Sequence, residues 1–420
     1  MNSMERRIMV VTCFGHLMSH YNMLVFPALI LPLAGLMKLP MTDVLGLSFW
    51  MYLLFGVMAL PWGMAGDKWG GRTLILIMFV GSGVSGLAAA FCLDSPKLIE
   101  VALASMGLFS AVYHPIGFGL ISKGVSRMTV ALGYNAVFGG LGLVTAPVIT
   151  GLTVWISGPQ AAFFVLALLN GLGVLIAVLL PLDESPLAES EKTEGNNGML
   201  GAFVILLVAM MLGGIAERGV TVILPSYLEL RGQGIFQWFS GSLGIPISRN
   251  LVATSVASLV YAVGMMGQYV GGHIGQRFEC RHSYLVFHTI CIPAVILMSF
   301  TQNIPLVFTS FVYLFFLLGM QPIENTLVAE YAPRRLLHSA YGLKFVLVFG
   351  VGSLAIKMIE RVDSVWGIEA TFIALGLVSV LLVATILVLI GWTNRSVHEP
   401  ADQPEEAFAG KLDGKCVSGG

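Results

Sequence analysis

Charged residues are scarce in this chain: they make up 11% of its 420 residues, whereas hydrophobic residues make up 56%. A typical soluble domain has about a quarter charged residues. So few charges cannot cover the surface of a water-facing globule of this size. The formal net charge is -1, so no basic field indicates a nucleic-acid partner.

Motifs for catalysis and cofactor binding are also missing. The sequence contains neither a GxxxxGK[ST] phosphate loop nor an HExxH zinc motif, so we expect no ATP-driven pump, no enzyme and no cofactor. The cysteines form no CxxC pair and mostly lie in apolar segments, which predicts small buried side chains rather than disulfides or a metal cluster. They are Cys13, Cys92, Cys280, Cys291 and Cys416.

Long apolar runs fill most of the chain. A helix that crosses the hydrocarbon core needs about 20 mostly apolar residues, and lipid tolerates only helices or closed barrels. The first run is too long for a signal-peptide core. We therefore predict an all-α membrane protein with twelve transmembrane helices, at 9–36, 44–65, 73–93, 98–121, 130–156, 160–182, 200–228, 251–274, 283–301, 305–330, 337–359 and 366–392.

The polar segments between the runs predict the domains and the topology. A charged segment in the middle of the chain separates six spans from six. The prediction is an N-terminal bundle at 1–182, a cytoplasmic linker at 183–199, a C-terminal bundle at 200–393 and a disordered cytoplasmic tail at 394–420. Most Lys and Arg residues outside the spans fall on the side of the termini, which predicts that both termini are cytoplasmic. A bacterial inner membrane, or a membrane derived from it, fits this prediction.

The most specific motif follows the second span and returns in the second half. Its sequence is Gly63-Met-Ala-Gly-Asp67-Lys68-Trp-Gly70-Gly71-Arg72, and Gln276, Arg277 and Arg281 stand 209 residues after Asp67, Lys68 and Arg72. The same shift maps Asn135 onto Lys344. Two related halves with binding between them near the midplane are a common transporter design.

At these residues the chain resembles the major facilitator superfamily. The stretch from Gly63 to Arg72 matches that family's signature G-x-x-x-D-[RK]-x-G-x-[RK]. In the fifth span, Gly142-x-x-x-Ala146-Pro147 is similar to the family's antiporter motif, with Ala146 in place of a glycine. The resemblance implies two pseudo-symmetric six-helix bundles, the major facilitator fold, and a small-molecule substrate.

A narrower resemblance concerns the first and fourth spans. The pattern Phe14-x-His16-x-x-x-His20 and the tripeptide Tyr113-His114-Pro115 are similar to the fosmidomycin-resistance-like branch of that family.

The signature residues are predicted to form a conformational gate. A carboxylate at the end of a span can cap a neighbouring helix and pair with arginine, and in the resembled family this contact locks a cytoplasmic gate. The alternative is that these charges only orient the chain in the membrane. The gate residues are Gly63, Asp67, Lys68, Gly70, Arg72, Gln276, Arg277 and Arg281.

Polar residues inside the apolar runs are functional candidates, because a charge in hydrocarbon is expensive. His16 and His20 lie four residues apart, on one helical face. In the resembled family, spans one, four, seven and ten line the central cavity, and most of the candidates fall on those spans. The predicted substrate and proton pathway consists of His16, His20, His114, Glu217, Arg218, Glu324, Asn325 and Lys344.

Several roles stay open for these residues. Histidine titrates near neutral pH, so His20, His114, Glu217 and Glu324 are candidates for proton coupling. The cations of Arg218 and Lys344 suit an anionic substrate group. Each residue could instead only pack or form a structural ion pair. Two histidines four apart with one carboxylate form a possible metal ligand set, but because no dense acidic cluster accompanies them we predict no metal site.

The predicted function is secondary active transport, powered by protons, of a small organic or drug-like molecule. The antiporter-like motif favours export in exchange for protons. We expect the protein to be a monomer that interacts with a small-molecule substrate, protons and the lipid bilayer. The alternatives are uptake or translocation of a metal ion or metal complex such as iron, and a sensor or scaffold that keeps a transporter-like shell. A small organic anion and an amphipathic drug are both compatible with the sequence.

Overall fold

The computed structural model describes residues 1–182, 199–244, 246–332 and 342–398, and every regular element within these ranges is helical. Twelve helical segments are long and apolar enough to cross a membrane. The prediction of an all-α protein with twelve transmembrane helices is therefore confirmed. The predicted linker lies almost wholly outside the described residues.

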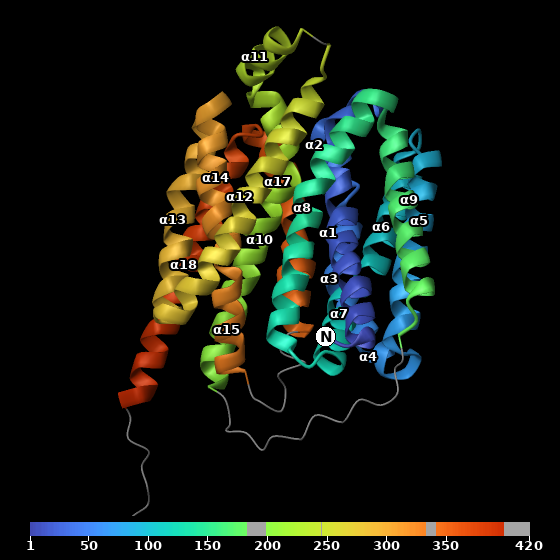
Figure 1. The fold of residues 1–420 in the computed structure, drawn as a ribbon. Helices are drawn as coiled ribbons and strands as arrows, with labels where there is room; N and C mark the ends of the chain where they lie inside the picture. The colour runs from blue at the N-terminus through green and yellow to red at the C-terminus, as the bar shows by residue number, and fades with distance from the viewer. Residues whose placement is uncertain (183–198, 245, 333–341, 399–420) are drawn as a thin grey trace, which may run out of the picture.

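The N-terminal half runs up to residue 182 and forms one group of helices in Figure 1. Two of its spans are divided: the second consists of three successive helices and the fourth of two. Its elements are α1 (Ser3–Met37), α2 (Met41–Gly46), α3 (Phe49–Val57), α4 (Ala59–Trp69), α5 (Gly71–Phe91), α6 (Pro96–Ser110), α7 (Tyr113–Gly124), α8 (Met128–Ser157) and α9 (Pro159–Leu179).

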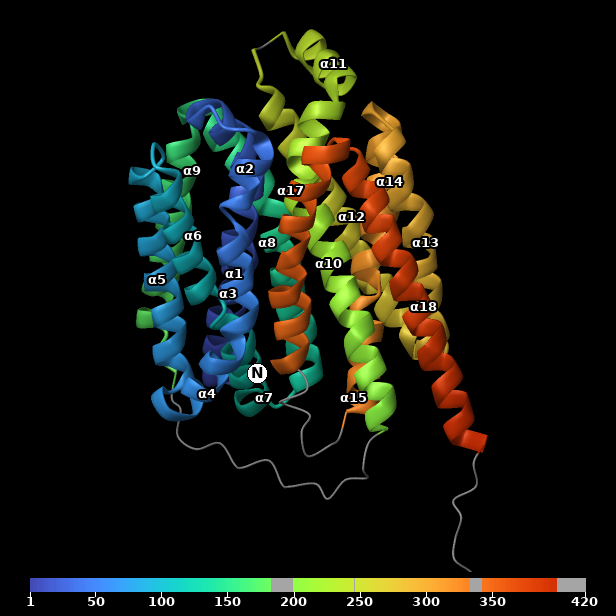
Figure 2. The same cartoon turned by 180° about the vertical axis from the view of Figure 1, so that it is seen from behind.

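The C-terminal half forms a second group beside the first (Figure 2). Its last helix extends to His398, beyond the predicted end at residue 393, because the first proline after the span is Pro400. Its elements are α10 (Leu200–Arg231), α11 (Gln233–Leu243), α12 (Arg249–Arg277), α13 (Cys280–Phe300), α14 (Asn303–Gly319), α15 (Gln321–Tyr331), the π-helix η2 (Val346–Gly350), η3 (Val351–Ser353), α17 (Leu354–Trp366) and α18 (Ala370–His398).

Apolar side chains cover the outside of both halves. Phe91 is 73% exposed, Leu168 71% and Leu377 63%. The most hydrophobic span, Ala370–Arg395, is also one of the least buried inside the protein. An outer surface of this kind is stable in lipid rather than in water.

Spans four and ten are broken at comparable places. Span four passes from α6 to α7 just before Tyr113-His114-Pro115, and span ten passes from α14 to α15 just before Gln321-Pro322. Proline lacks an N–H and is tolerated in the first turn of a helix, so a new helix begins at each site. At the first break the indole of Trp62 donates to the carbonyl of Leu108, at 2.8 Å. Each break places polar side chains deep inside a span.

The two ends of the molecule are distinct. The N-terminus and the end of α18 lie at the same end, together with the α4–α5 junction, and we call this end the terminal face (Figures 1 and 2). Helix α11 lies at the other end. Most of the site described below lies between these two ends.

Candidate functional site

Three histidines gather in the N-terminal half. His16 and His20 come from α1, and His114 comes from the start of α7. The Nε2 atoms of His16 and His20 are 3.2 Å apart, and the ring of His114 lies edge-on to both, with centroids 5.5 Å and 5.4 Å away. We call these residues the histidine cluster. His16 and His114 are buried, and His20 is partly buried.

Neighbouring residues hold His16 in one orientation. Its Nδ1 lies 2.9 Å from the backbone carbonyl of Asn135 on α8. Because a carbonyl oxygen only accepts, Nδ1 carries the proton in this contact. Tyr113 stacks on the ring at 4.8 Å, and the phenol of Tyr113 is hydrogen-bonded to the side chain of Asn135. The remaining nitrogen of His16, Nε2, therefore carries a lone pair and accepts the hydrogen bond from Nε2 of His20.

The histidine cluster borders the C-terminal half through aromatic rings. The ring centroid of His114 lies 5.6 Å from that of Phe55 in α3, 5.0 Å from that of Phe345 and 5.5 Å from that of Phe349. Phe349 belongs to the π-helix η2, and single π-turns inside helices are frequent at functional sites. An apolar wall built from both halves thus lies beside a polar cluster built from one.

An ionic cluster lies in the C-terminal half. The Nζ of Lys344 lies 2.7 Å from a carboxylate oxygen of Glu324, and both side chains are buried, with 8% and 3% exposed. Lys344 also donates to Asn325 at 2.6 Å, and the phenol of Tyr284 donates to Glu324 at 2.8 Å. Glu324 lies in the first turn of α15, where the helix dipole favours a negative charge. We call Glu324, Lys344, Asn325 and Tyr284 the ionic cluster.

Glu217 and Arg218 lie on α10, between the two clusters. The amide of Gln321 donates to the carboxylate of Glu217 at 3.4 Å and 3.5 Å, and Gln321 in turn is hydrogen-bonded to Gln268. Within the described ranges, no Lys, Arg or His nitrogen lies within ion-pair distance of this carboxylate. Glu217 is thus a partly buried acid that is held by an amide.

Arg218 crosses from α10 to the N-terminal half. Its guanidinium lies over the ring of Tyr52 in α3, 4.1 Å from the centroid, and 5.8 Å from the centroid of Phe349. Its side chain is 9% exposed, its Nε makes no hydrogen bond within the described part of the chain, and it forms no ion pair there. A desolvated cation of this kind is stabilised by aromatic faces but keeps donors available for an anion.

The first predicted gate lies at the junction of α4 and α5 on the terminal face. Gly70 separates the two helices with a positive φ of 79°, a conformation that favours glycine. Gly63 and Gly71 let these helices approach α7, because a Cβ atom there would lie 3.3 Å from Pro115 and 2.8 Å from Leu120. The side chain of Asp67 lies outside the described part of the structure, and its gating role, with Lys68 and Arg72, stays a prediction.

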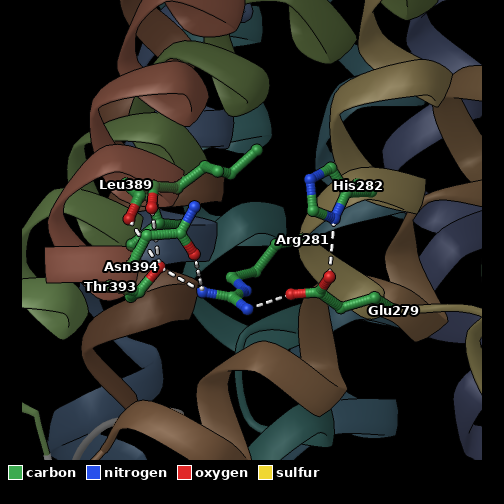
Figure 3. Close-up of polar contacts among 7 residues, drawn as sticks. Glu279, Arg281, His282, Leu389, Thr393 and Asn394 are labelled. Atoms are coloured by element: carbon green, nitrogen blue, oxygen red, sulfur yellow. Dashed lines mark hydrogen bonds and ion pairs between the residues drawn. The ribbon is translucent and has the colours of Figure 1, made fainter. Parts of the chain in front are cut away.

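The second predicted gate lies at the corresponding junction of α12 and α13. Gln276 and Arg277 are the last residues of α12. Arg281 forms an ion pair with Glu279 and donates hydrogen bonds to the side chains of Thr393 and Asn394 at the end of α18 (Figure 3). Arg281 therefore ties α13 to α18 inside one half, rather than tying the two halves together.

Glu279 is an exposed acid between two bases, as Figure 3 shows. Its carboxylate also contacts the Nδ1 of His282 at 2.7 Å. Partial burial raises the pKa of Glu279, but the hydrogen bonds and charges of Arg281 and His282 outweigh it, so the pKa is lowered below its usual value.

The antiporter-like stretch of span five lies where the halves meet. A Cβ atom on Gly140 would lie 2.6 Å from the sulfur of Met265 in α12, and Gly151 packs against Thr254 of the same helix. Next to Pro147, the backbone N–H of Val148 donates to the hydroxyl of Ser258, also in α12, at 3.0 Å. This glycine-bearing face of α8 therefore forms a close contact between the halves.

Sequence reasoning missed some members of the site. Tyr284, which binds Glu324, and Tyr52, which lies beneath Arg218, gave no signal, because single tyrosines are common in spans. Gln321 gave a signal that was not used: it is a polar residue inside an apolar run, directly before Pro322. Every predicted pathway residue lies in one of the two clusters or on α10 between them.

Three solved structures share the fold of this chain at low sequence identity. A bacterial homolog of the human lysosomal transporter Spinster, inward-facing and occupied, gives a TM-score of 0.69 at 13% identity, over 93% of this chain and 98% of that chain. A mutant of the nucleoside transporter NupG gives 0.72 at 13% identity, over 92% and 99%. A POT family transporter in complex with 5-aminolevulinic acid gives 0.73 at 14%, over 91% and 95%.

These structures establish the fold, and the sequence itself establishes the family. No curated protein matches the chain. The sequence pattern of the Major Facilitator Superfamily matches residues 11–356. The resemblance to the fosmidomycin-resistance-like branch gains no support from any comparison. The chain belongs to the Major Facilitator Superfamily and is a membrane transporter rather than an enzyme.

Proposed function

We propose that this transporter exports a small organic molecule in exchange for protons, by alternating access of its two halves. The observation that carries the proposal is Glu217, a partly buried acid between the clusters with an amide partner and no ion-pair partner within the described ranges. Such a carboxylate can hold either a proton or a hydrogen-bond-donating cationic group of a substrate, but not both. Mutually exclusive binding of this kind is the physical requirement for exchange.

Glu324 provides a second protonation site and a link to movement. A proton on Glu324 would remove the charge that holds Lys344 at 2.7 Å. Lys344 directly precedes Phe345, whose ring stacks on that of Phe349 at 5.7 Å. Release of Lys344 would therefore shift Phe345 and Phe349, whose rings contact His114 in the other half. Proton transfer at this site would change how the two halves pack.

The aromatic wall favours a substrate with an apolar part. Phe55, Phe345 and Phe349 surround His114 with ring centroids at 5.0–5.6 Å. Aromatic walls with a few convergent polar groups are typical of small-molecule sites. A drug-like molecule with one positive group near Glu217 fits this arrangement best.

A second candidate function, proton-driven uptake of a small organic anion, is favoured by Arg218. Its guanidinium is buried, makes no ion pair among the described residues and keeps an unused Nε donor. An anion held there would bind together with a proton on Glu324, because that proton frees Lys344 as a second cation. Proton and substrate would then move in the same direction.

Proteoliposomes with an imposed pH gradient distinguish these functions. The assay compares amphipathic cations with organic anions in the wild type, in Glu217→Gln and in the matched control Glu330→Gln, whose side chain is exposed near the end of α15. Exchange predicts that cation transport runs against the proton gradient and falls at least tenfold in Glu217→Gln alone. Anion transport that runs with the gradient and depends on Arg218 would establish the second candidate and refute the first.

The orientation and the oligomeric state belong to the same proposal. We infer a monomer with both termini cytoplasmic in a bacterial inner membrane, or a membrane derived from it, because Lys and Arg residues concentrate on the terminal face. Reporter fusions at the two termini and in α11 test the topology. A reporter in α11 that is active on the same side as the termini would contradict it.

A further inference from the structure

We propose that the histidine cluster is a binding site for one divalent first-row transition-metal ion, with three imidazole ligands and an open fourth position. The site consists of His16, His20 and His114. This inference does not depend on proton-coupled export, because it concerns equilibrium binding without a gradient. From the sequence alone we predicted no metal site, because no dense acidic cluster accompanies the histidines; the spacing along the chain did not place His114 beside His16 and His20.

The spacing of the ring nitrogens suits such an ion. The three candidate ligand nitrogens all lie within 4.8 Å of one another, and those of His16 and His20 are 3.2 Å apart. Zinc binds imidazole at about 2.0–2.1 Å, which places two nitrogens of a tetrahedral site roughly 3.4 Å apart. One pair already has this spacing, and the nitrogen of His114, which lies within 4.8 Å of both, has to move closer when an ion binds.

The orientation of His16 is that of a metal ligand. Its Nδ1–H donates to the carbonyl of Asn135, so its Nε2 carries a lone pair that faces the other two rings. Histidines that bind metals generally donate their second ring N–H to a carbonyl or carboxylate, which fixes tautomer and ring orientation. Asn135 is itself fixed by hydrogen bonds with Tyr113. The ligand is thus oriented before any ion arrives.

Glycines on α8 make room for the cluster. A Cβ atom on Gly139 would lie 2.6–2.7 Å from the ring of His16, and one on Gly142 would lie 3.1 Å from the Cβ of His20. Any larger residue at Gly139 would displace the imidazole. The helix packing of α1 against α8 is therefore shaped around these side chains.

The ligand set determines the class of ion. Imidazole nitrogen suits Zn²⁺, Co²⁺, Ni²⁺, Cu²⁺ and Fe²⁺, whereas Mg²⁺ and Ca²⁺ require oxygen ligands. Three protein ligands leave a fourth position for water or for an anionic oxygen. Arg218 lies on the other side of Phe349, whose ring centroid is 5.8 Å from the guanidinium and 5.5 Å from the ring of His114, and its positive charge favours an anion in that position. The site therefore fits a transition-metal ion with one exchangeable ligand.

Cobalt titration of the full-length protein tests the proposal. The protein is purified in detergent, its affinity tag is removed, and visible absorption and metal content are measured. We expect one Co²⁺ per chain with the absorption of a four-coordinate ion, displaced by Zn²⁺ and unaffected by Mg²⁺. His114→Ala and the double variant His16→Ala with His20→Ala should bind at least tenfold more weakly. The control His273→Ala, which changes an exposed histidine of α12, should bind like the wild type.

Two further measurements keep the inference falsifiable if a histidine variant does not fold. Gly139→Ala retains all three histidines but pushes a methyl group against His16, so it should weaken cobalt binding. X-ray absorption of the zinc-loaded wild type should show three imidazole nitrogens at about 2.0 Å. Fewer than three imidazole ligands, equal cobalt affinity in His114→Ala, or binding that is lost only in His273→Ala would overturn the proposal.

Discussion

The two halves share an architecture but differ in the chemistry that they place at corresponding positions. In the N-terminal half, Asn135 contacts Tyr113 at the start of α7. In the C-terminal half, Lys344, which stands 209 residues after Asn135, contacts Glu324 at the start of α15. One break in a span therefore presents imidazole and amide groups, and the other presents a buried ion pair. The shared backbone sets where polar groups lie, and residue type sets whether they suit a metal ion or a proton.

The largest loss of stability is expected when the buried ion pair of the C-terminal half, Glu324 with Lys344, loses one member. Lys344→Met removes one partner and leaves the carboxylate of Glu324 buried without its cation. Loss of one member of a buried pair costs about 3–5 kcal/mol. Thermal unfolding of the detergent-purified variant should show this loss as a lower Tm.

The matched control is the double variant Lys344→Met with Glu324→Gln, which removes both charges. It should recover most of the lost stability, since neutral groups of similar size can replace a buried pair. Neither the single nor the double variant should transport. A single variant as stable as the wild type would show that the pair is not buried in the native protein.

The second prediction concerns metal and the N-terminal half. If the histidine cluster binds the ion only in the folded state, a ligand concentration one hundred times the Kd stabilises the protein by about 2.7 kcal/mol. Zn²⁺ should therefore raise the Tm of the wild type and of Lys344→Met, but not that of His114→Ala. A rise that is equal in all three would place the binding elsewhere.

Two tyrosines allow the two halves to be compared directly, because each makes a hydrogen bond beside one of the two clusters: Tyr284 with Glu324 and Tyr113 with Asn135. Tyr284→Phe removes a hydrogen bond to a charged carboxylate, worth about 1.5–3 kcal/mol. Tyr113→Phe removes the contact of one phenol with one neutral amide, in which a single well-aligned hydrogen bond is worth about 0.5–1.5 kcal/mol. Chemical or thermal unfolding of the two variants should rank Tyr284→Phe as the more damaging. The reverse ranking would contradict the assignment of charge to the C-terminal half.

The smallest effect is expected at the exposed pair of the second gate. Glu279 has a lowered pKa in the folded protein, so its carboxylate stabilises the fold above the unfolded pKa of about 4.3 and loses this effect as the pH falls through the folded value. The side chain is 45% exposed, and solvent limits such a pair to about 0–1 kcal/mol. Glu279→Gln should lower the Tm slightly at pH 7, and this difference should shrink below the unfolded pKa and vanish once the pH has fallen through the folded one. A loss as large as that of Lys344→Met would mean that the exposed pair is structural.

The sequence predicted the fold well because hydrophobic length decides it. Each of the twelve predicted apolar runs corresponds to a helical span. The breaks inside spans four and ten were not predicted, since each span is apolar enough over its whole length to be read as one helix. The prolines at 115 and 322, with the polar residues beside them, mark the breaks. The end of α18 at His398 was missed because polar residues can continue a helix beyond the lipid.

The sequence predicted which residues belong to the candidate site, but not which of them contact one another. Position within a span indicated that His114 and Glu324 lie deep in the membrane. Nothing in the sequence stated that His114 meets His16 and His20, or that Tyr284 meets Glu324, because those contacts depend on how distant helices pack. Local spacing predicted only the pair on one helix face, His16 and His20.

The most direct test asks whether the carboxylates of the C-terminal half, and not the histidines of the N-terminal half, carry the protons that move with the substrate. Proteoliposomes loaded with a pH-sensitive dye are given the transported cation, and the internal pH is followed in the wild type, in Glu217→Gln with Glu324→Gln, and in His16→Ala with His20→Ala. We predict that protons move in the wild type and in the histidine variant but not in the carboxylate variant. Proton movement that persists without both carboxylates, or that stops when only the histidines are removed, would contradict the account.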